Sequence, residues 1–163
     1  MKNIEFYRFL ISLAKDLNRF YKKNLNKPFK AINKGKGSNY DPVTVADKKF
    51  EKFIRSKINK KYPSHSIVGE EFGKKETKSD YSWVIDPIDG TENFISGMKE
   101  WGIGISVFTK GQHIYSFIHL PELNETIDNI MKLDRFESRI SGISSSLSFY
   151  DLKKLKFQSY EYR

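Results

Sequence analysis

Asp86, Asp89 and Thr91 lie within six residues, directly after the apolar run of residues 83–85. The dipeptides Asp-Pro and Asp-Gly both favour turns, so the segment predicts a strand that ends in a sharp corner. Such a corner would direct both carboxylates and the carbonyl of Ile88 toward one point. Neighbouring carboxylates repel one another unless a cation offsets their charge, and hard oxygen ligands suit Mg²⁺. A plain polar turn would account for a single Asp-Gly pair but not for the whole segment, so we predict a magnesium site here.

Gly90 and Thr91 follow the second of these acids. A glycine lets the backbone approach a ligand closely, and a helix that began at Thr91 would present free amides to an anion. Thr91 has an alternative role as a helix cap, and the two roles are compatible. The sequence therefore indicates an anion site beside the cation site.

Two further acids, Glu70 and Asp47, stand upstream. Glu70 follows a short apolar segment, in VGEEFG, and a lone Glu-Glu pair would ordinarily be a solvated turn; the role of Glu71 is open. Asp47 has a competing explanation, because Thr44 and Asp47 have the spacing of a helix capping box. One residue can serve both a cap and a reaction site, so we keep Asp47 as a candidate.

These motifs together resemble the inositol monophosphatase family of magnesium-dependent, lithium-sensitive phosphatases. The resemblance rests on DPVTVAD, VGEEFG and WVIDPIDGTENF, and it extends from about residue 4 to about residue 120. It implies hydrolysis of a phosphate monoester of a small metabolite by metal-activated water, without a covalent intermediate.

The resemblance also implies a role for each candidate residue. The implied metal ligands are Glu70, Asp86, the carbonyl of Ile88, and Asp89. The implied catalytic residues are Asp47, Glu70 and Thr91, which would position and deprotonate the attacking water. The amides of Gly90 and Thr91 would bind the substrate phosphate. Lys34 and Lys36 would correspond to a mobile lysine-bearing loop of the family, although a solvated linker explains them equally well.

The motifs point to two branches of the family. GEEFG with FISGMKEWG resembles the histidinol-phosphatase-like branch, whereas YPSHSIVGEE and DGTENF resemble the inositol branch. The substrate class is therefore left open between histidinol phosphate and inositol phosphate.

The elements that must position these residues follow from apolar periodicity. The pattern predicts helices over residues 3–24 and about 44–61, and strands over 66–69, 82–86, 103–108, 114–120 and about 126–131. Residues 25–40 and 73–80 are expected to be loops, and residues 144–157 a further helix. The residues expected to face inward are Ile4, Tyr7, Ile11, Ala14, Leu17 and Tyr21 in the first helix, and Phe50, Phe53, Ile54 and Ile58 in the second.

The fold class we predict is α+β, with two long helices packed on a mostly antiparallel sheet. This arrangement resembles the N-terminal half of the layered αβαβα sugar-phosphatase fold. We expect an inositol-monophosphatase-like αβ domain over residues 1–131 and a short divergent or truncated segment over residues 132–163. The family's later Trp-Asp segment, which supplies a further metal ligand, is not found in this sequence.

Composition narrows the remaining classes of function. The 163-residue chain has a net charge of +9, which could attract phosphorylated metabolites or nucleic acid. Lysines spread over solvated faces explain this charge more simply, and no nucleic-acid-binding motif accompanies them. His65, His113 and His119 lack metal-ligand spacing and are expected to be structural or exposed.

Localisation follows from two absences in the sequence. The chain contains no cysteine, which fits a cytoplasmic location. No stretch approaches the roughly 20 apolar residues of a membrane span, and charged residues flank the short apolar run at residues 9–14, so we expect neither a membrane segment nor a signal peptide.

Three hypotheses remain. The first is an active Mg²⁺ phosphatase, completed if necessary by a homodimer or a partner chain. The second is a catalytically dead remnant that binds metal or phosphate without turnover. The third is a basic nucleic-acid-binding module, against which the clustered carboxylates argue and for which salt-dependent binding would be the test.

Overall fold

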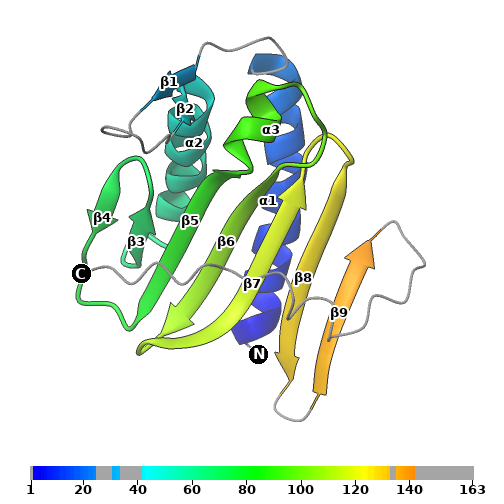
Figure 1. The fold of residues 1–163 in the computed structure, drawn as a ribbon. Helices are drawn as coiled ribbons and strands as arrows, with labels where there is room; N and C mark the ends of the chain where they lie inside the picture. Colours follow the sequence, from blue (N-terminus) through cyan, green and yellow to red (C-terminus); the bar gives the residue numbers. More distant parts are fainter. Residues whose placement is uncertain (1, 25–30, 34–41, 133–134, 142–163) are drawn as a thin grey trace.

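The computed structural model describes residues 2–24, 31–33, 42–132 and 135–141 (Figure 1). Lys34, Lys36 and the helix predicted over residues 144–157 lie outside this part of the chain. Within it, no helix is long and apolar enough to cross a membrane.

Two long helices form as predicted. Helix α1 spans Lys2–Asn24 and helix α2 spans Val45–Lys61. Helix α2 ends directly before Tyr62-Pro63, because the residue that precedes a proline avoids helical geometry. Its inward face also agrees with the prediction, since Phe50, Ile54 and Ile58 are fully buried and Phe53 packs at the edge of the core.

The buried face of α1 agrees with the prediction only in part, since Ala14 and Leu17 are buried as expected. Ile4 is 56% exposed, and Tyr7 and Tyr21 are only partly buried. The side chains that α1 does bury are Phe6, Leu10, Leu13, Ala14 and Leu17. Both stripes repeat with helical spacing, so periodicity alone could not choose between them. The Phe and Leu side chains pack against the sheet. The tyrosines stay at the border of the core, because a tyrosine hydroxyl needs a polar partner.

The helices pack on a seven-stranded sheet with the order β4-β3-β5-β6-β7-β8-β9. Its strands are β3 (Ser66–Gly69), β4 (Gly73–Lys75), β5 (Tyr81–Asp89), β6 (Gly102–Thr109), β7 (Gln112–Leu120), β8 (Glu125–Lys132) and β9 (Arg135–Ser141). All neighbours are antiparallel except β3 and β5, which are parallel. The predicted α+β class with a mostly antiparallel sheet is confirmed.

Four strands were not predicted. Strand β1 (Ala31–Asn33) lies in the region 25–40 that was expected to be a loop. It pairs with β2 (Pro42–Thr44), which lies just after that region and leads into α2. Strand β4 lies in the predicted loop 73–80, and β9 continues the sheet beyond residue 131. Each of β1 and β4 has only three residues, which is too short to show a repeat. A division of the chain into domains at residue 131 stays a prediction.

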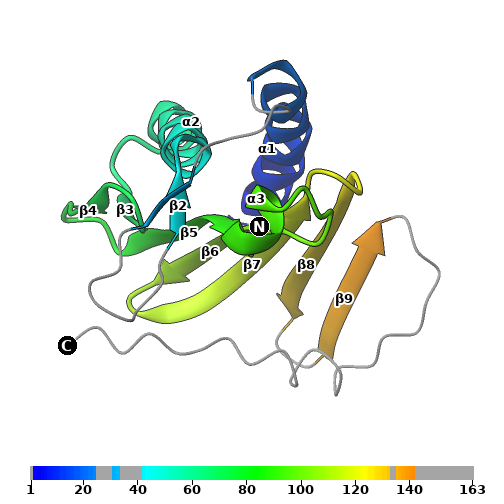
Figure 2. The same ribbon diagram turned by 45° about the horizontal axis from the view of Figure 1, so that its top comes forward.

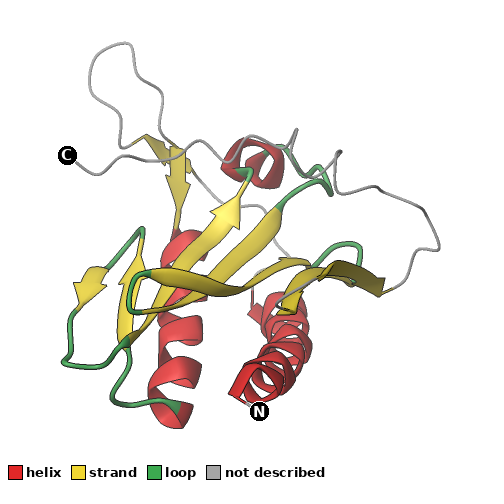
Figure 3. Ribbon diagram, turned by 90° about the horizontal axis from the view of Figure 1, so that it is seen from below, coloured by secondary structure: helices red, strands yellow, loops and turns green. Residues whose placement is uncertain are grey.

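Helices α1 and α2 lie on the same face of the sheet (Figures 2 and 3). Alternate residues of the central strands point toward them, and these side chains are at most 2% exposed: Trp83, Ile85, Ile103, Ile105, Val107, Tyr115 and Phe117. Burying a side chain of this size stabilises the fold by roughly 1.5–3 kcal/mol. The central strands are therefore the most firmly held part of the scaffold.

Candidate active site

The end of β5 carries the acids that the sequence singled out. In the pairing of β5 with β6, Asp86 lies opposite Gly104 and Asp89 lies opposite Gly102, with a bulge between them. Residues three apart in a regular strand point to opposite faces, and the extra residue of a bulge reverses that alternation. The predicted corner is therefore a bulge within β5, and the strand continues to Asp89 rather than ending at Asp86.

Gly90 makes the turn that follows. Its φ of 85° is left-handed, and it is the N-cap of the short helix α3 (Thr91–Ile95). A Cβ at this position would stand 3.3 Å from the carbonyl oxygen of Glu100. Both the backbone angle and the close approach favour glycine here.

Thr91 is the first residue of α3 rather than its cap, so the cap role considered for it is wrong. Its hydroxyl donates a hydrogen bond of 3.0 Å to the carbonyl oxygen of Ile88. The Ile88 side chain is buried in the core, which fixes that carbonyl. A carbonyl oxygen has two lone pairs, so this bond leaves one acceptor position for another partner.

The parallel pairing of β3 and β5 brings Glu70 close to Asp86. Gly69 lies opposite Ile85 in that register, so Glu70 and Asp86 are the next residues along the two strands. Asp47 is in the first turn of α2 and is 3% exposed. Because α2 leads directly into β3, the N-terminus of α2 and the C-terminal ends of β3 and β5 lie at the same end of the molecule (Figure 1). The capping and catalytic explanations of Asp47 both fit this position.

The electrostatics of Asp86 show that the predicted acids act on one another. Burial raises the pKa of Asp86 to about 7, with further contributions from the charges of Asp89, Glu70 and Asp47. The Oδ1 atom of Asp86 is buried and has no hydrogen-bond partner. A buried acceptor without a partner is costly, and a cation would satisfy it.

The carboxylates are not, however, gathered as a finished ligand set. Within the described ranges, no three His, Cys, Asp or Glu side chains are placed so that they could hold a metal ion. Mutual repulsion opposes such a grouping when no positive charge offsets it. The chemistry of the donors, four carboxylates acting on one another together with the Ile88 carbonyl, fits Mg²⁺, which prefers oxygen ligands.

Two of the three histidines make structural hydrogen bonds. The Nδ1 atom of His65 accepts a 3.0 Å hydrogen bond from the indole Nε1 of Trp83. His119 is 1% exposed and contacts Thr126 and Asn18 through its two ring nitrogens.

Glu51 is the residue of this region that the sequence analysis missed. Its side chain is fully buried beneath the turn that follows β3. A signal was present, because Glu51 stands between Phe50 and Ile54 in the apolar stripe of α2, four residues after Asp47. A charged residue in such a stripe rarely remains without a partner.

Comparison with known proteins agrees with this geometry. A model of the inositol monophosphatase family matches residues 2–141. The bifunctional phosphatase IMPL2 of Arabidopsis thaliana is 40% identical over 116 residues, which is 70% of this chain and 33% of that protein. The Nus factor SuhB of Escherichia coli K12 is 39% identical over 116 residues, 71% of this chain and 43% of that protein.

A histidinol-phosphatase of Chlorobaculum parvum is 39% identical over 84 residues, 52% of this chain and 32% of that protein. Among solved structures, an IMPase/NADP phosphatase complexed with Mg²⁺ and phosphate has a TM-score of 0.72 at 19% identity. That match covers 88% of this chain and 53% of the other. The chain thus spans about a third to two fifths of these curated relatives.

The family match covers most of the chain, and it includes the elements that bring Asp47, Glu70, Asp86 and Asp89 together. The chain belongs to the inositol monophosphatase family.

Proposed function

We propose that this protein is a Mg²⁺-dependent phosphomonoesterase that hydrolyses a small phosphorylated metabolite. The observation that carries the proposal is the state of Asp86, which is partly buried, repelled by three neighbouring acids, and left with a buried Oδ1 atom that has no hydrogen-bond partner. A protein tolerates such an arrangement when a cation binds there. Family membership supplies the reaction class, since the curated relatives include enzymes named as phosphatases.

Each residue of the proposed site would have a distinct role in the reaction. Glu70, Asp86, the Ile88 carbonyl and Asp89 would hold the metal. Bound Mg²⁺ would neutralise phosphate charge and lower the pKa of a coordinated water. The Thr91 hydroxyl donates a hydrogen bond to the Ile88 carbonyl. Its oxygen still has lone pairs that can accept a hydrogen bond from the attacking water.

Two further groups complete the proposed site. Asp47, buried at the start of α2, would accept the proton of the attacking water, while Thr91 would orient that water by accepting a hydrogen bond from it. The backbone amides of Gly90 and Thr91, at the beginning of α3, would donate to the phosphate oxygens. The left-handed turn at Gly90 is what brings these amides to the end of β5.

The substrate proposal rests on the motifs and on the relatives. Inositol phosphate and histidinol phosphate are the two candidates, because the motifs resemble both branches and one relative is named a histidinol-phosphatase. A homodimer or a partner chain that completes the site belongs to the same proposal, as does a cytoplasmic location. The relatives are two to three times as long as the matched segments of the chain.

The first test is Mg²⁺ binding and Mg²⁺-dependent phosphate release, with inositol phosphate, histidinol phosphate, a sugar phosphate and adenosine bisphosphate as substrates. Asp89→Asn should weaken Mg²⁺ binding in calorimetry by tenfold or more, because it removes a charged ligand. Asp80→Asn is the matched control, since Asp80 is exposed in the loop before β5 and pairs with Lys110 at 3.7 Å. An unchanged Mg²⁺ affinity in Asp89→Asn would contradict the proposed ligand set.

A second candidate is a protein that binds metal or phosphate without turnover. The sequence feature that favours it is that the family's later Trp-Asp segment, which supplies a further metal ligand, is not found in this sequence. Mg²⁺ binding with no phosphate release from any of the four substrates would support this candidate. Salt-dependent binding of DNA or RNA would instead favour the nucleic-acid alternative.

A further inference from the structure

Glu51 is a charged residue in the interior, one helical turn after Asp47 on α2. Its side chain is 0% exposed. A buried carboxylate is stable only when hydrogen bonds or opposite charge compensate it. The partners of Glu51 therefore show what the residue does in this structure.

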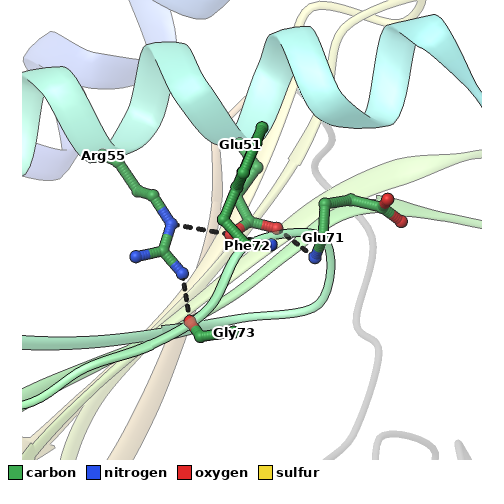
Figure 4. A network of polar contacts seen from close by, with 5 residues as sticks. All are labelled: Glu51, Arg55, Glu71, Phe72 and Gly73. Carbon is green, nitrogen blue, oxygen red and sulfur yellow. Dashed lines mark hydrogen bonds and ion pairs between the residues drawn. The ribbon is translucent and has the colours of Figure 1, made fainter.

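The partners lie in the turn between β3 and β4 (Figure 4). The Oε2 atom accepts a 2.6 Å bond from the backbone amide of Glu71, and Oε1 accepts one of 3.2 Å from the amide of Phe72. Arg55 completes the network, because its Nε donates to Oε1 at 2.7 Å and its Nη2 donates to the carbonyl of Gly73. Helix α2 thus holds three consecutive residues of the turn through two side chains.

The contact extends to the residue before Glu70. A Cβ placed on Gly69 would lie 2.1 Å from Oε1 of Glu51 and 3.0 Å from Nη2 of Arg55. No side chain can occupy this space while Glu51 stays where it is. Glu70 is therefore enclosed on both sides, with Gly69 packed against the carboxylate and the Glu71 amide bonded to it.

We propose that Glu51, neutralised by Arg55, is a positioning residue that fixes the backbone of Glu70 so that its carboxylate faces Asp86. This inference rests on the proposed function, in which Glu70 is a metal ligand. Glu51 is not itself a ligand in this proposal, because both of its oxygens already accept hydrogen bonds. It acts through the turn that carries Glu70.

The position demands a carboxylate rather than an amide. Three N–H groups donate to the two oxygens of Glu51, and an ionised carboxylate only accepts. A glutamine has one oxygen and one NH₂ group, so at least one of the three donors would face another donor. Glu51→Gln keeps the size of the side chain while it disrupts the hydrogen bonds to Arg55 and to the amides of Glu71 and Phe72.

The test compares Mg²⁺ binding by the full chain and its variants in calorimetry. Glu51→Gln should raise the Kd for Mg²⁺ about tenfold or more, the usual effect of removing a group that orients a ligand. Hydrogen exchange at the amides of Glu71 and Phe72 should accelerate in the same variant. Glu5→Gln is the matched control, because Glu5 is an exposed helical glutamate that pairs with Lys61 at 3.3 Å, and it should leave the Kd unchanged.

A second variant covers the case in which Glu51→Gln does not fold. Arg55→Lys keeps the positive charge, but one ammonium group cannot reproduce the two-pronged contact of the guanidinium with Glu51 and Gly73. It should raise the Kd for Mg²⁺ several-fold. A residue with a merely structural role would lower the melting temperature of the metal-free protein and leave the Kd of the folded fraction as it is.

The outcomes separate this inference from the proposed function. An unchanged Kd in Glu51→Gln, or in Arg55→Lys if the former does not fold, would overturn the positioning role and leave the metal site standing. A wild-type chain that binds no Mg²⁺ would overturn both. If the wild type binds Mg²⁺ but releases no phosphate, the hydrolase proposal fails, and the ratio of the Kd values still decides the role of Glu51.

Discussion

Replacing Asp86 with asparagine should stabilise the metal-free protein at neutral and alkaline pH. The pKa of Asp86 rises from 3.8 to about 7, first through burial and then through the charges of Asp89, Glu70 and Asp47. A raised pKa in the folded state means that ionising the acid destabilises the fold. Below the unfolded-state pKa the acid is protonated in both states, so this cost is absent. The cost grows between pH 4 and pH 7 and is complete above that range.

The size of the effect follows from the same values. At 1.36 kcal/mol for each tenfold change in an acid constant, a rise from 3.8 to about 7 corresponds to a cost of about 4 kcal/mol. Asparagine carries no charge and keeps an oxygen that can accept the backbone bond from Ile88. We therefore expect Asp86→Asn to raise the free energy of unfolding by about 2–4 kcal/mol at pH 8 in the presence of a chelator, and by much less at pH 4.

Urea denaturation at pH 4, 6 and 8, with and without Mg²⁺, measures this directly. With the chelator, the stability of the wild type relative to Asp86→Asn should fall as the pH rises from 4 to 7. Added Mg²⁺ should stabilise the wild type and leave the variant almost unchanged, because only a native-state ligand shifts the equilibrium. A difference between the two proteins that stays constant from pH 4 to pH 8 would refute the raised pKa of Asp86.

Two further predictions concern the scaffold. Burial lowers the pKa of His119 from 6.5 to about 4, so its contribution to stability is complete above pH 6.5 and is lost as the pH falls toward 4, a change of about 3 kcal/mol. His119→Gln should flatten that part of the stability profile in urea denaturation, and an equally steep profile in the variant would contradict the assignment. Gly69→Ala should destabilise the fold by about 2–4 kcal/mol, because the new methyl group displaces Glu51 and leaves buried amides without an acceptor. Thermal unfolding of Gly69→Ala beside Gly104→Ala, whose new methyl group would meet only the Cβ of Asp86 at 3.5 Å, measures this, and similar losses in both variants would count against a specific clash.

The sequence predicted the central strands well because the patterns that indicate them lie within a few consecutive residues. Residues 103–107 alternate strictly, and the segment after Trp83 combines an apolar run with turn-forming dipeptides. The four acids were assigned to one site from motif resemblance alone. The parallel register of Gly69 with Ile85 makes Glu70 and Asp86 the next residues along two neighbouring strands. The bulge that turns Asp86 and Asp89 to the same face was not predicted, because one extra residue in a strand leaves no recognisable pattern in the sequence.

The features that the sequence did not reveal depend on contacts between distant segments. Strand β4 exists because Gly73–Lys75 pairs with β3 and Arg55 binds the carbonyl of Gly73. The buried stripe of α1 was chosen by the sheet, since Ile4 and Phe6 belong to stripes of equal periodicity. Glu51 showed a local anomaly, a charge within an apolar stripe, but its partners are about twenty residues away.

The single parallel pair in the sheet has a consequence for the order of folding. From β5 to β9, each strand pairs with its successor in the chain, so these contacts close short loops and are expected to form early. Strand β3 can join β5 only after the chain has passed through β4 and the loop that follows it. We therefore expect β3 and its edge neighbour β4, and with them Glu70, to dock last on an already formed meander. Pulse-labelled hydrogen exchange during refolding should accordingly protect the amides of β7 before those of β3.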